Sequence, residues 1–309
     1  MVGMSRFLLW CWGRTLSTAF ILKRCLSWVW VFKECQLIFQ WGFCITTNTS
    51  ILDENAFNAF KNIQGICFDV DDTLSTEGKL THEAYAALWR LYRAGYQVVA
   101  VTGRASGWCD HMVRFWPVHA VLGENGAFSF WMKRGVRQTL LTLGGISQEQ
   151  LLTQKLQLMK SVQEVFSEVL WASDQPYRTH DLAIDIGEGV PRWDSQDIER
   201  LMELCQQKGA VVRLSSIHVN AWFGDYDKWK GFQFWLEQEA EQKKVDTWAY
   251  IGDSPNDEPM FKRFHCSVGV ANVAAYLPSF KYPPQWITRK KSGSGFVEFV
   301  DFLEKVRGI

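Results

Sequence analysis

The sequence carries no excess of charge of either sign. Lys plus Arg number 33 and Asp plus Glu number 33, so the formal net charge is zero. A chain without surplus positive charge gives no support for a nucleic acid or another polyanion as a partner. The balance remains compatible with a small anionic ligand that is held by a few local groups.

The sequence also has no CxxC pair, although it contains eight cysteines. Four of them lie in the first fifty residues, and the other four are scattered over the rest of the chain. This pattern gives no disulfide framework, and it is typical of small, buried, apolar side chains in a reducing compartment. We therefore expect a cytoplasmic protein.

No uninterrupted apolar run reaches the roughly 20 residues that a membrane-spanning helix needs. Lys23, Arg24 and Lys33 interrupt the apolar N-terminal segment, whose first acidic residue is Glu34. Three interpretations are open: an acid-poor organelle-targeting segment, a membrane anchor, or an extension that adds nothing to the fold. We favour the last for the first fifty residues because no clean periodicity appears, and we expect the folded part to begin near Ile51. Residues 1–55 are then an N-terminal extension without an assigned role, and we expect no membrane partner.

From residue 60 onward, strand patterns alternate with helical patterns. The runs GICFDV, YQVVAVTGR and HAVLGENGA are apolar and continuous. Continuous apolar strands separated by helices indicate a parallel sheet that is covered on both faces. We therefore predict an α/β fold with a doubly wound, Rossmann-like core. Residues 81–95 read as one of its helices, capped by Thr81 and presenting one face made of Tyr85, Leu88, Trp89 and Tyr92.

Residues 129–221 break this rhythm. Ser147 and Gln150 form a capping-box pattern at the start of a helix that runs from Gln148 to about Leu170. A half-buried strand (DLAIDIGE), a second helix and a further strand pattern (AVVRLSSIHVNAWF) follow. The mixture predicts an inserted α+β domain. The parallel rhythm resumes in TWAYIGDSPND, so residues 56–128 and 222–309 are expected to form one core.

Three of the predicted strand ends carry polar side chains: Asp69–Thr73, Thr102–Arg104 and Asp253–Asp257. In open α/β sheets, ligands bind outside the carboxyl ends of the strands. Asp69 and Asp71 are two residues apart, so they point the same way if the backbone stays extended there. Carboxylates this close need a counter-charge, which a hard divalent cation such as Mg²⁺ supplies. Asp253 would complete such a site.

The segments FDVDDTL, VVAVTGR, DYDKWKG and YIGDSPNDEPMF occur in this order. Together they resemble the four signature motifs of the haloacid dehalogenase (HAD) superfamily of phosphotransferases, over about residues 60–309. The insert that follows GENGA is similar to the C2 cap of the IIB subgroup, which includes sugar-phosphate phosphatases and phosphomannomutases. The resemblance implies a HAD-type core, a cap domain at residues 129–221 and Mg²⁺ as the cofactor.

The resemblance also implies residue roles. Asp69 would be the nucleophile that forms an aspartyl-phosphate, and Asp71 the general acid and base. Thr102 would hydrogen-bond the transferring phosphoryl group, and a lysine would neutralise its charge. The metal ligands would be Asp69, the backbone carbonyl of Asp71, and Asp253. Asn256 and Asp257 would support the metal and orient the lysine.

The lysine is ambiguous, since Lys228 and Lys230 both lie in the third motif. Lys230 precedes Gly231, as in many relatives. Lys228 is followed in the chain by apolar residues at helical spacing. We favour Lys228.

Arg104 is as compatible with a surface position as with a phosphate contact. Five polar residues of the insert are candidates for the substrate pocket, although a structural role is the commoner outcome for each one singly: Arg178, His180, Arg213, His218 and Asn220.

These observations favour a Mg²⁺-dependent phosphomonoester hydrolase that acts on a sugar phosphate or a similar small metabolite. Two alternatives stay open at this point. One is a phosphomutase of the same superfamily, which would return the phosphoryl group to the sugar. The other is a binding protein that keeps the HAD fold without turnover. The sequence names neither the substrate nor the oligomeric state.

Overall fold

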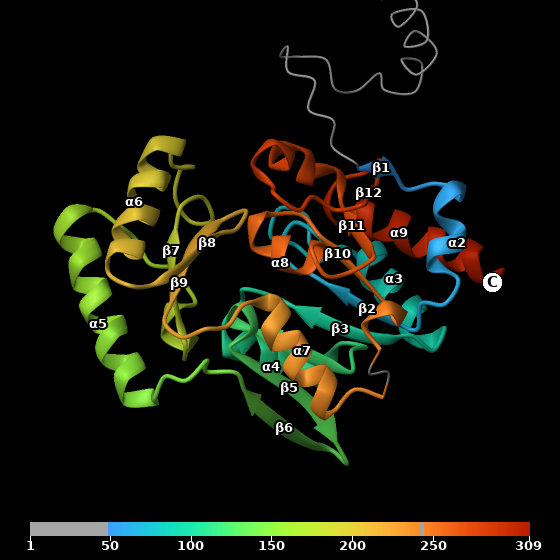
Figure 1. Cartoon of the computed structure of the whole chain (residues 1–309), viewed down its shortest axis with the longest axis horizontal. Helices are drawn as coiled ribbons and strands as arrows, with labels where there is room; N and C mark the ends of the chain where they lie inside the picture. The colour runs from blue at the N-terminus through green and yellow to red at the C-terminus, as the bar shows by residue number, and fades with distance from the viewer. Residues whose placement is uncertain (1–48, 242–243) are drawn as a thin grey trace, which may run out of the picture. The chain divides into compact units, whose positions relative to one another are not determined.

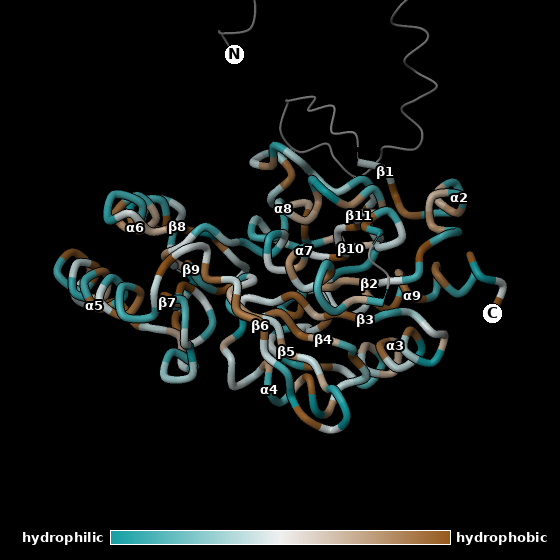
Figure 2. Tube along the Cα trace, turned by 60° about the horizontal axis from the view of Figure 1, so that its bottom comes forward, coloured by the Kyte–Doolittle hydropathy of each residue, from teal (hydrophilic) through white to brown (hydrophobic). Residues whose placement is uncertain are grey.

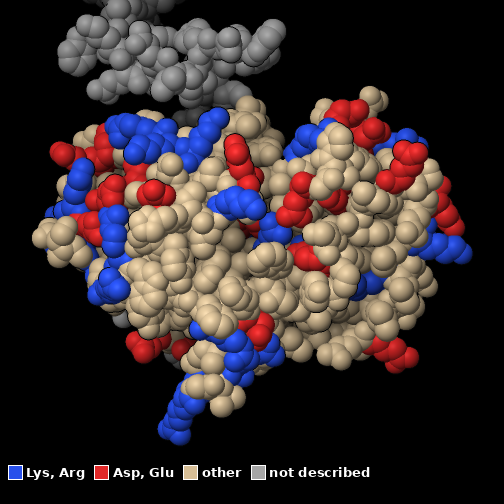
Figure 3. All heavy atoms as spheres, turned by 180° about the vertical axis from the view of Figure 1, so that it is seen from behind, with Lys and Arg blue, Asp and Glu red and all other residues tan. Residues whose placement is uncertain are grey.

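The structure, a computed structural model, describes residues 49–241 and 244–309. The three interpretations of the N-terminal segment concern residues that lie almost entirely outside this range. Within the described residues, no helix is both long enough and apolar enough to cross a bilayer. Lys and Arg are interspersed with Asp and Glu on the face shown in Figure 3, in keeping with the balanced composition.

The continuous apolar runs form the centre of a large sheet (Figure 1), whose strand order is β1-β12-β11-β10-β2-β3-β4-β5-β6. Its first seven strands in this order are parallel. They are β1 (Ser50–Ile51), β12 (Trp286–Ile287), β11 (Cys266–Gly269), β10 (Trp248–Gly252), β2 (Gly65–Phe68), β3 (Gln97–Val101) and β4 (Ala120–Gly123). Two antiparallel strands, β5 (Phe128–Lys133) and β6 (Val136–Leu141), extend the sheet beyond β4. The parallel centre confirms the predicted α/β fold class.

Helices cover both faces of the large sheet. Alternate strand residues point to opposite faces, so Ile66 and Phe68 of β2 belong to one core cluster and Cys67 to the other. The first cluster packs under α2 (Phe57–Phe60), α3 (His82–Arg93), α4 (Ser106–Phe115) and α9 (Ser292–Arg307). The second packs under α7 (Lys228–Gln238) and α8 (Glu258–Phe261). Figure 2 shows hydrophobic residues along the strands between these helices.

The predicted face of α3 differs from the observed one. The helix buries Ala84, Ala87, Leu88 and Leu91, whereas Tyr92 is 41% exposed. The buried side faces α9, against which α3 packs. Small alanine side chains allow this close approach of two helices, and the larger aromatic residues lie toward the edge of the contact.

A second, small sheet has the order β7-β9-β8 and is antiparallel throughout. Its strands are β7 (Asp181–Asp185), β9 (His218–Trp222) and β8 (Val211–Leu214). The helices α5 (Gln148–Val165) and α6 (Ser195–Gln207) pack on one face of it through a separate apolar cluster (Figure 1). The capping box at Ser147 and Gln150 is present, and α5 ends at Val165 rather than near Leu170.

The strands β5 and β6 fall within residues 129–221, which the sequence pattern assigned to the insert, yet they pair with the large sheet. The part of the chain that leaves the large sheet therefore begins after Leu141. The large and small sheets belong to one compact unit, Thr47–Ile309. The division into a core and a cap domain stays a prediction, with a shorter insert than the sequence suggested.

Candidate active site

Three chain segments meet because their strands are neighbours in the large sheet. Asp69 directly follows β2, Thr102 follows β3 and Asp253 follows β10. The strand β2 lies between β10 and β3, and all three are parallel. Their carboxyl ends thus share one edge, where ligands bind in sheets of this kind. All three side chains are buried.

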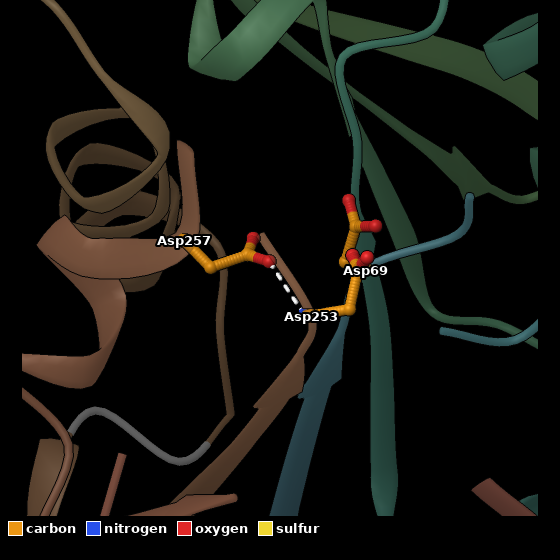
Figure 4. A group of neighbouring side chains, drawn as sticks. All are labelled: Asp69, Asp253 and Asp257. Carbon is orange, nitrogen blue, oxygen red and sulfur yellow. Dashed lines mark hydrogen bonds between the residues drawn. The ribbon is translucent and has the colours of Figure 1, made fainter. Parts of the chain in front are cut away.

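Three carboxylates gather at this edge (Figure 4). One oxygen from each of Asp69, Asp253 and Asp257 lies within 4.8 Å of the others, and all three residues are buried. The backbone N–H of Asp253 donates to Asp257 Oδ2 over 2.9 Å, which is the dashed line in the figure. Buried like charges at this separation repel each other strongly unless a cation lies between them.

Lys228 supplies one positive charge to the cluster. Its Nζ donates to Asp69 Oδ1 and to Asp257 Oδ1, each over 2.6 Å. Lys228 is the first residue of α7, and a glycine contact fixes the position of that helix. A Cβ at Gly126 would lie 2.3 Å from the carbonyl oxygen of Asp227, and one at Gly231 would lie 2.5 Å from that of Gly126. Only glycines allow this approach.

Lys230 is placed differently. Its side chain is 42% exposed and pairs with the exposed Asp225. The geometry therefore brings Lys228, and not Lys230, to the carboxylates.

Asp257 is fully engaged by the protein. Its Oδ1 accepts hydrogen bonds from Lys228 and from the hydroxyl of Tyr250, and its Oδ2 accepts from the backbone N–H groups of Asp253 and Ser254. A carboxylate with four donors has little capacity left for a metal ion. This arrangement suits the expected orienting role for Asp257 better than a ligand role.

Asp253 is held by two residues that the sequence motifs did not indicate. The hydroxyl of Thr73 donates to its Oδ1 over 3.3 Å, and Asn272 Nδ2 donates to its Oδ2 over 3.0 Å. Asn272 also donates to the backbone carbonyl of Asp72. Thr73 lies within the first motif but had no role assigned to it, and Asn272 lies outside the four motifs, so only the folded structure identifies their contacts with Asp253.

The electrostatics of the cluster show a shortage of positive charge. Burial raises the pKa of Asp69 to about 8, and the neighbouring carboxylates add to the rise, against the lowering effect of Lys228. Burial likewise raises the pKa of Asp253 well above its usual range. Burial by itself would lower the pKa of Lys228, but Asp257 and Asp69 raise it. One ammonium group thus serves three carboxylates, and their hard oxygen donors fit a divalent cation such as Mg²⁺.

Asp71 does not join this group. Its carboxylate pairs with Arg104 in a two-pronged contact, with Arg104 Nη2 at 2.7 Å from Asp71 Oδ1 and Nε at 2.9 Å from Oδ2. Arg104 Nη2 is also 2.9 Å from Glu188 Oε1. Arg104 is therefore neither a surface charge nor a free phosphate ligand here, because it ties Asp71 to the loop that follows β7.

Residues 66–175 match the family model of haloacid dehalogenase-like hydrolases. Over these residues, about a third of the chain, the sequence is similar to this family. The match covers the first two expected motifs and part of the insert, and it confirms the resemblance seen in the sequence. A comparison with curated protein sequences returned no match.

Solved structures share the fold of this chain at low sequence identity. The C-terminal domain of trehalose-6-phosphate phosphatase from C. albicans has a TM-score of 0.63 at 13% identity, covering 84% of this chain and 98% of that one. A putative HAD/COF-like hydrolase from Plasmodium vivax has a TM-score of 0.62 at 18% identity, covering 81% and 98%. The sucrose-phosphatase from Synechocystis, solved with sucrose and phosphate, has a TM-score of 0.56 at 15% identity, covering 78% and 98%.

A small cavity separates the carboxyl edge of the large sheet from the small sheet. Asp69, Asp71 and Arg104 line it on one side, and Ser215–His218 and Asn220 line it on the other. Asp69 and Asp71 thus both border this cavity, and their convergence on a metal ion stays a prediction. The volume of the cavity is about 10 Å³, which is room for about one water molecule. The small sheet is closed over the buried carboxylates in this structure.

Asn256 is one of the residues that line the cavity, and Thr102 is not. Thr102 Oγ1 accepts from the backbone N–H of Arg104 over 3.0 Å, so its own hydroxyl proton stays available as a donor. Asn256 lines the cavity and donates from Nδ2 to Asn125 Oδ1 over 3.2 Å. Asn125 belongs to the GENGA segment, which the sequence analysis used only to mark the start of the insert.

Glu124, in the same segment, is a connection that sequence reasoning missed. Its carboxylate is fully buried and accepts hydrogen bonds from the backbone N–H groups of Thr179, His180 and Asp181, which lead into β7. Burial opposes its ionised form, but the hydrogen bonds from His180 and from the backbone of Thr179 leave its pKa lowered overall. Glu124 therefore anchors the small sheet to the end of β4.

The five candidates in the insert divide into two groups. His218 and Asn220 line the cavity. Arg178 also reaches it, but its guanidinium is taken up by Asp174, Asp181 and the carbonyl of Gly103. Arg213 and His180 are not among the cavity residues. Arg213 donates to the carbonyl of Val212, and His180 contacts the hydroxyl of Thr179.

Proposed function

We propose that this hydrolase is a Mg²⁺-dependent phosphomonoesterase that works through an aspartyl-phosphate on Asp69. The observation that carries the proposal is the buried group of Asp69, Asp253 and Asp257 around Lys228. Burying such a group of charges lowers the free energy of unfolding. Covalent phosphoryl transfer requires each of its members, namely a nucleophile, a metal ligand, an orienting carboxylate and a positive charge. A cytoplasmic location remains our expectation.

In the first step, a carboxylate oxygen of Asp69 attacks phosphorus, and the bond between phosphorus and the leaving oxygen breaks. The leaving alkoxide takes a proton from Asp71. In the second step, a water molecule gives a proton to Asp71 and attacks the phosphorus, and the bond to Asp69 breaks. Water is consumed, and alcohol and phosphate are released. Lys228 and Thr102 stabilise the charge on the phosphoryl oxygens.

The pairing of Asp71 with Arg104 occupies both carboxylate oxygens, with Arg104 Nη2 2.7 Å from Oδ1 and Nε 2.9 Å from Oδ2. Proton exchange with the leaving group or with water requires that Arg104 release Asp71. Glu188 holds the other side of Arg104, so movement of the small sheet is a means to this release.

The carboxylates of Asp69 and Asp253, with the backbone carbonyl of Asp71, would hold the Mg²⁺ ion. When bound, Mg²⁺ supplies the positive charge that the three carboxylates lack and that a transferring phosphoryl group needs. Asp257 would hold Lys228 toward Asp69, and Asn256 would support the loop that carries Asp253.

The small sheet with α5 and α6 would act as a cap. A cavity of about 10 Å³ holds no phosphate ester, so the cap must open to admit substrate and close to exclude bulk water. The fold is shared with a trehalose-6-phosphate phosphatase and with a sucrose-phosphatase. By this analogy, a phosphorylated sugar or a similar small metabolite is the proposed substrate class.

A phosphate-release screen tests the proposal. The purified hydrolase is assayed on sugar phosphates, nucleotides and an aryl phosphate, with Mg²⁺ and with chelator. We expect Mg²⁺-dependent release of inorganic phosphate, lost in Asp69→Asn and kept in Asp225→Asn, whose carboxylate is exposed. A rearranged sugar phosphate without phosphate release would identify a mutase instead. No turnover of any ester would leave only a binding role.

A further inference from the structure

The small sheet turns a polar face toward the active-site cavity. In β9, Val219 and Ala221 belong to the apolar cluster under α5 and α6. Alternation along the strand therefore directs His218, Asn220 and Trp222 to the opposite face. Two of these three line the cavity together with Asp69 and Asp71, while Trp222 packs in the core of the large sheet.

Asn220 differs from its polar neighbours on this face. It is 1% exposed, and its Oδ1 has no hydrogen-bond partner among the described residues. By contrast, His218 Nε2 lies 3.0 Å from Glu188 Oε2, and the buried Arg178 is held by two carboxylates. An unsatisfied buried acceptor destabilises the folded protein. Such an acceptor at a cavity wall points to a partner that arrives with the substrate.

We propose that Asn220 determines specificity by hydrogen-bonding a hydroxyl group of the leaving alcohol. This inference rests on the proposed phosphatase function. A neutral amide offers both an acceptor and donors, and so does a hydroxyl group. The substrates are then phosphate esters of polyhydroxylated alcohols, and esters of plain alkyl alcohols are disfavoured.

The position of Asn220 fits this role. The phosphoryl group reacts at Asp69, and the leaving oxygen takes its proton from Asp71, on the same side of the cavity. The alcohol must then extend from Asp71 toward the small sheet, where Asn220 and His218 form the opposite wall. Because Glu188 and Arg104 already engage the charged groups nearby, the amide of Asn220 is the group left to select a neutral hydroxyl.

The test compares two substrates of equal carbon count, glucose 6-phosphate and hexyl phosphate, in wild type and in Asn220→Leu. Leucine keeps the shape of the side chain and removes both polar atoms. We expect the kcat/KM ratio of the sugar ester to the alkyl ester to fall by about 10- to 100-fold in the variant, the effect of leaving one neutral substrate group unpaired. Asn58→Leu, at an exposed position on α2, serves as the control and keeps the wild-type ratio.

A second measurement separates recognition from a structural role. Because Asn220→Leu removes an unsatisfied buried acceptor, the substrate-free variant is expected to melt no lower than wild type. An unchanged kcat/KM ratio would overturn the inference, as would a lower melting temperature with equal losses on both esters. If wild type cleaves both esters equally well, the inference is contradicted and the proposed function is not. Wild type that releases phosphate from no ester would sink the proposed function, and the inference with it.

Discussion

Lys228 Nζ lies 2.6 Å from Asp69 Oδ1, and the lysine side chain has no exposed surface. The same ammonium group lies 2.6 Å from Asp257 Oδ1. A single buried cation therefore joins the expected nucleophile to the loop after β10. Three of the following predictions test the balance of charge in this cluster, and the fourth tests how the small sheet is held over it.

The first prediction compares the two lysines of the third motif. Lys228→Met leaves buried carboxylates without their partner, and we expect the free energy of unfolding of the metal-free protein to fall by about 3 kcal/mol or more. Lys230→Met removes only an exposed pair, and its effect should stay within about 0.5 kcal/mol. Urea denaturation in the presence of chelator measures both. Equal effects of the two substitutions would contradict the central place of Lys228.

The second prediction concerns the metal. Mg²⁺ is expected to raise the melting temperature of wild type, because an ion that binds only the folded state stabilises it. Asp253→Asn removes one of three crowded carboxylates, so the metal-free variant should melt at or above the wild-type temperature. Its Mg²⁺ affinity should fall at least about 100-fold, since even changes to outer partners of metal ligands cost 10- to 100-fold.

Differential scanning calorimetry with and without Mg²⁺ measures these shifts, with Asp225→Asn as the matched control. An Asp253→Asn variant that keeps the full Mg²⁺-induced shift would remove Asp253 from the metal site.

The third prediction follows from the raised pKa of Asp69, which is about 8 in the folded protein against an ordinary value of 3.8. Between these values the folded state binds more protons than the unfolded state, so this group makes the metal-free protein less stable as the pH rises. Asp69→Asn does not titrate. Relative to wild type, the variant should therefore gain stability from about pH 4 to about pH 8.

Urea unfolding of both proteins in chelator, across this pH range, isolates the contribution of Asp69. Stability curves that run parallel at all pH values would show that Asp69 has an ordinary pKa. Saturating Mg²⁺ should flatten the difference, because the bound cation favours the ionised carboxylate.

The fourth prediction concerns the contact that closes the small sheet. Glu188 pairs with Arg104, which follows β3 of the large sheet, and with His218 of β9. The hydrogen bond from His218, together with the charge of Arg104, lowers the pKa of Glu188 to about 2. Because Glu188 is only half-buried, we expect Glu188→Gln to weaken closure by about 1 kcal/mol, or about 5-fold in the population of the open state.

Amide hydrogen exchange in residues 215–218 should accelerate by that factor. Glu199→Gln, on the exposed side of α6, should leave it unchanged. Identical exchange in wild type and Glu188→Gln would show that the Glu188–Arg104 pair does not hold the small sheet in its closed position.

Local patterns sufficed for much of the fold. Continuous apolar runs predicted the parallel strands, since a strand buried on both faces needs apolar residues at every position. The capping box at Ser147 marked the start of α5 correctly. The boundary of the insert could not be predicted from local patterns, because the sequences of β5 and β6 fit a strand of either sheet. The pairing of β5 with β4, and of β6 with β5, assigns both strands to the large sheet.

The same division applies to the candidate site. The strand patterns placed Asp69 and Asp253 at strand ends that must meet at one sheet edge, and the resemblance to the HAD motifs added Asp257. The sequence favoured Lys228 over Lys230 without excluding Lys230, since the choice depends on which side chain the position of α7 turns toward the carboxylates.

The sequence by itself determined which residues lie at the ends of the parallel strands, because hydrophobic periodicity acts over a few neighbouring residues. Only the tertiary structure decided that Arg104 holds Asp71, that Glu124 anchors β7, and that Asn220 faces the carboxylates with an unsatisfied oxygen. These contacts join segments that are tens of residues apart, and their geometry depends on how two sheets pack rather than on any local pattern.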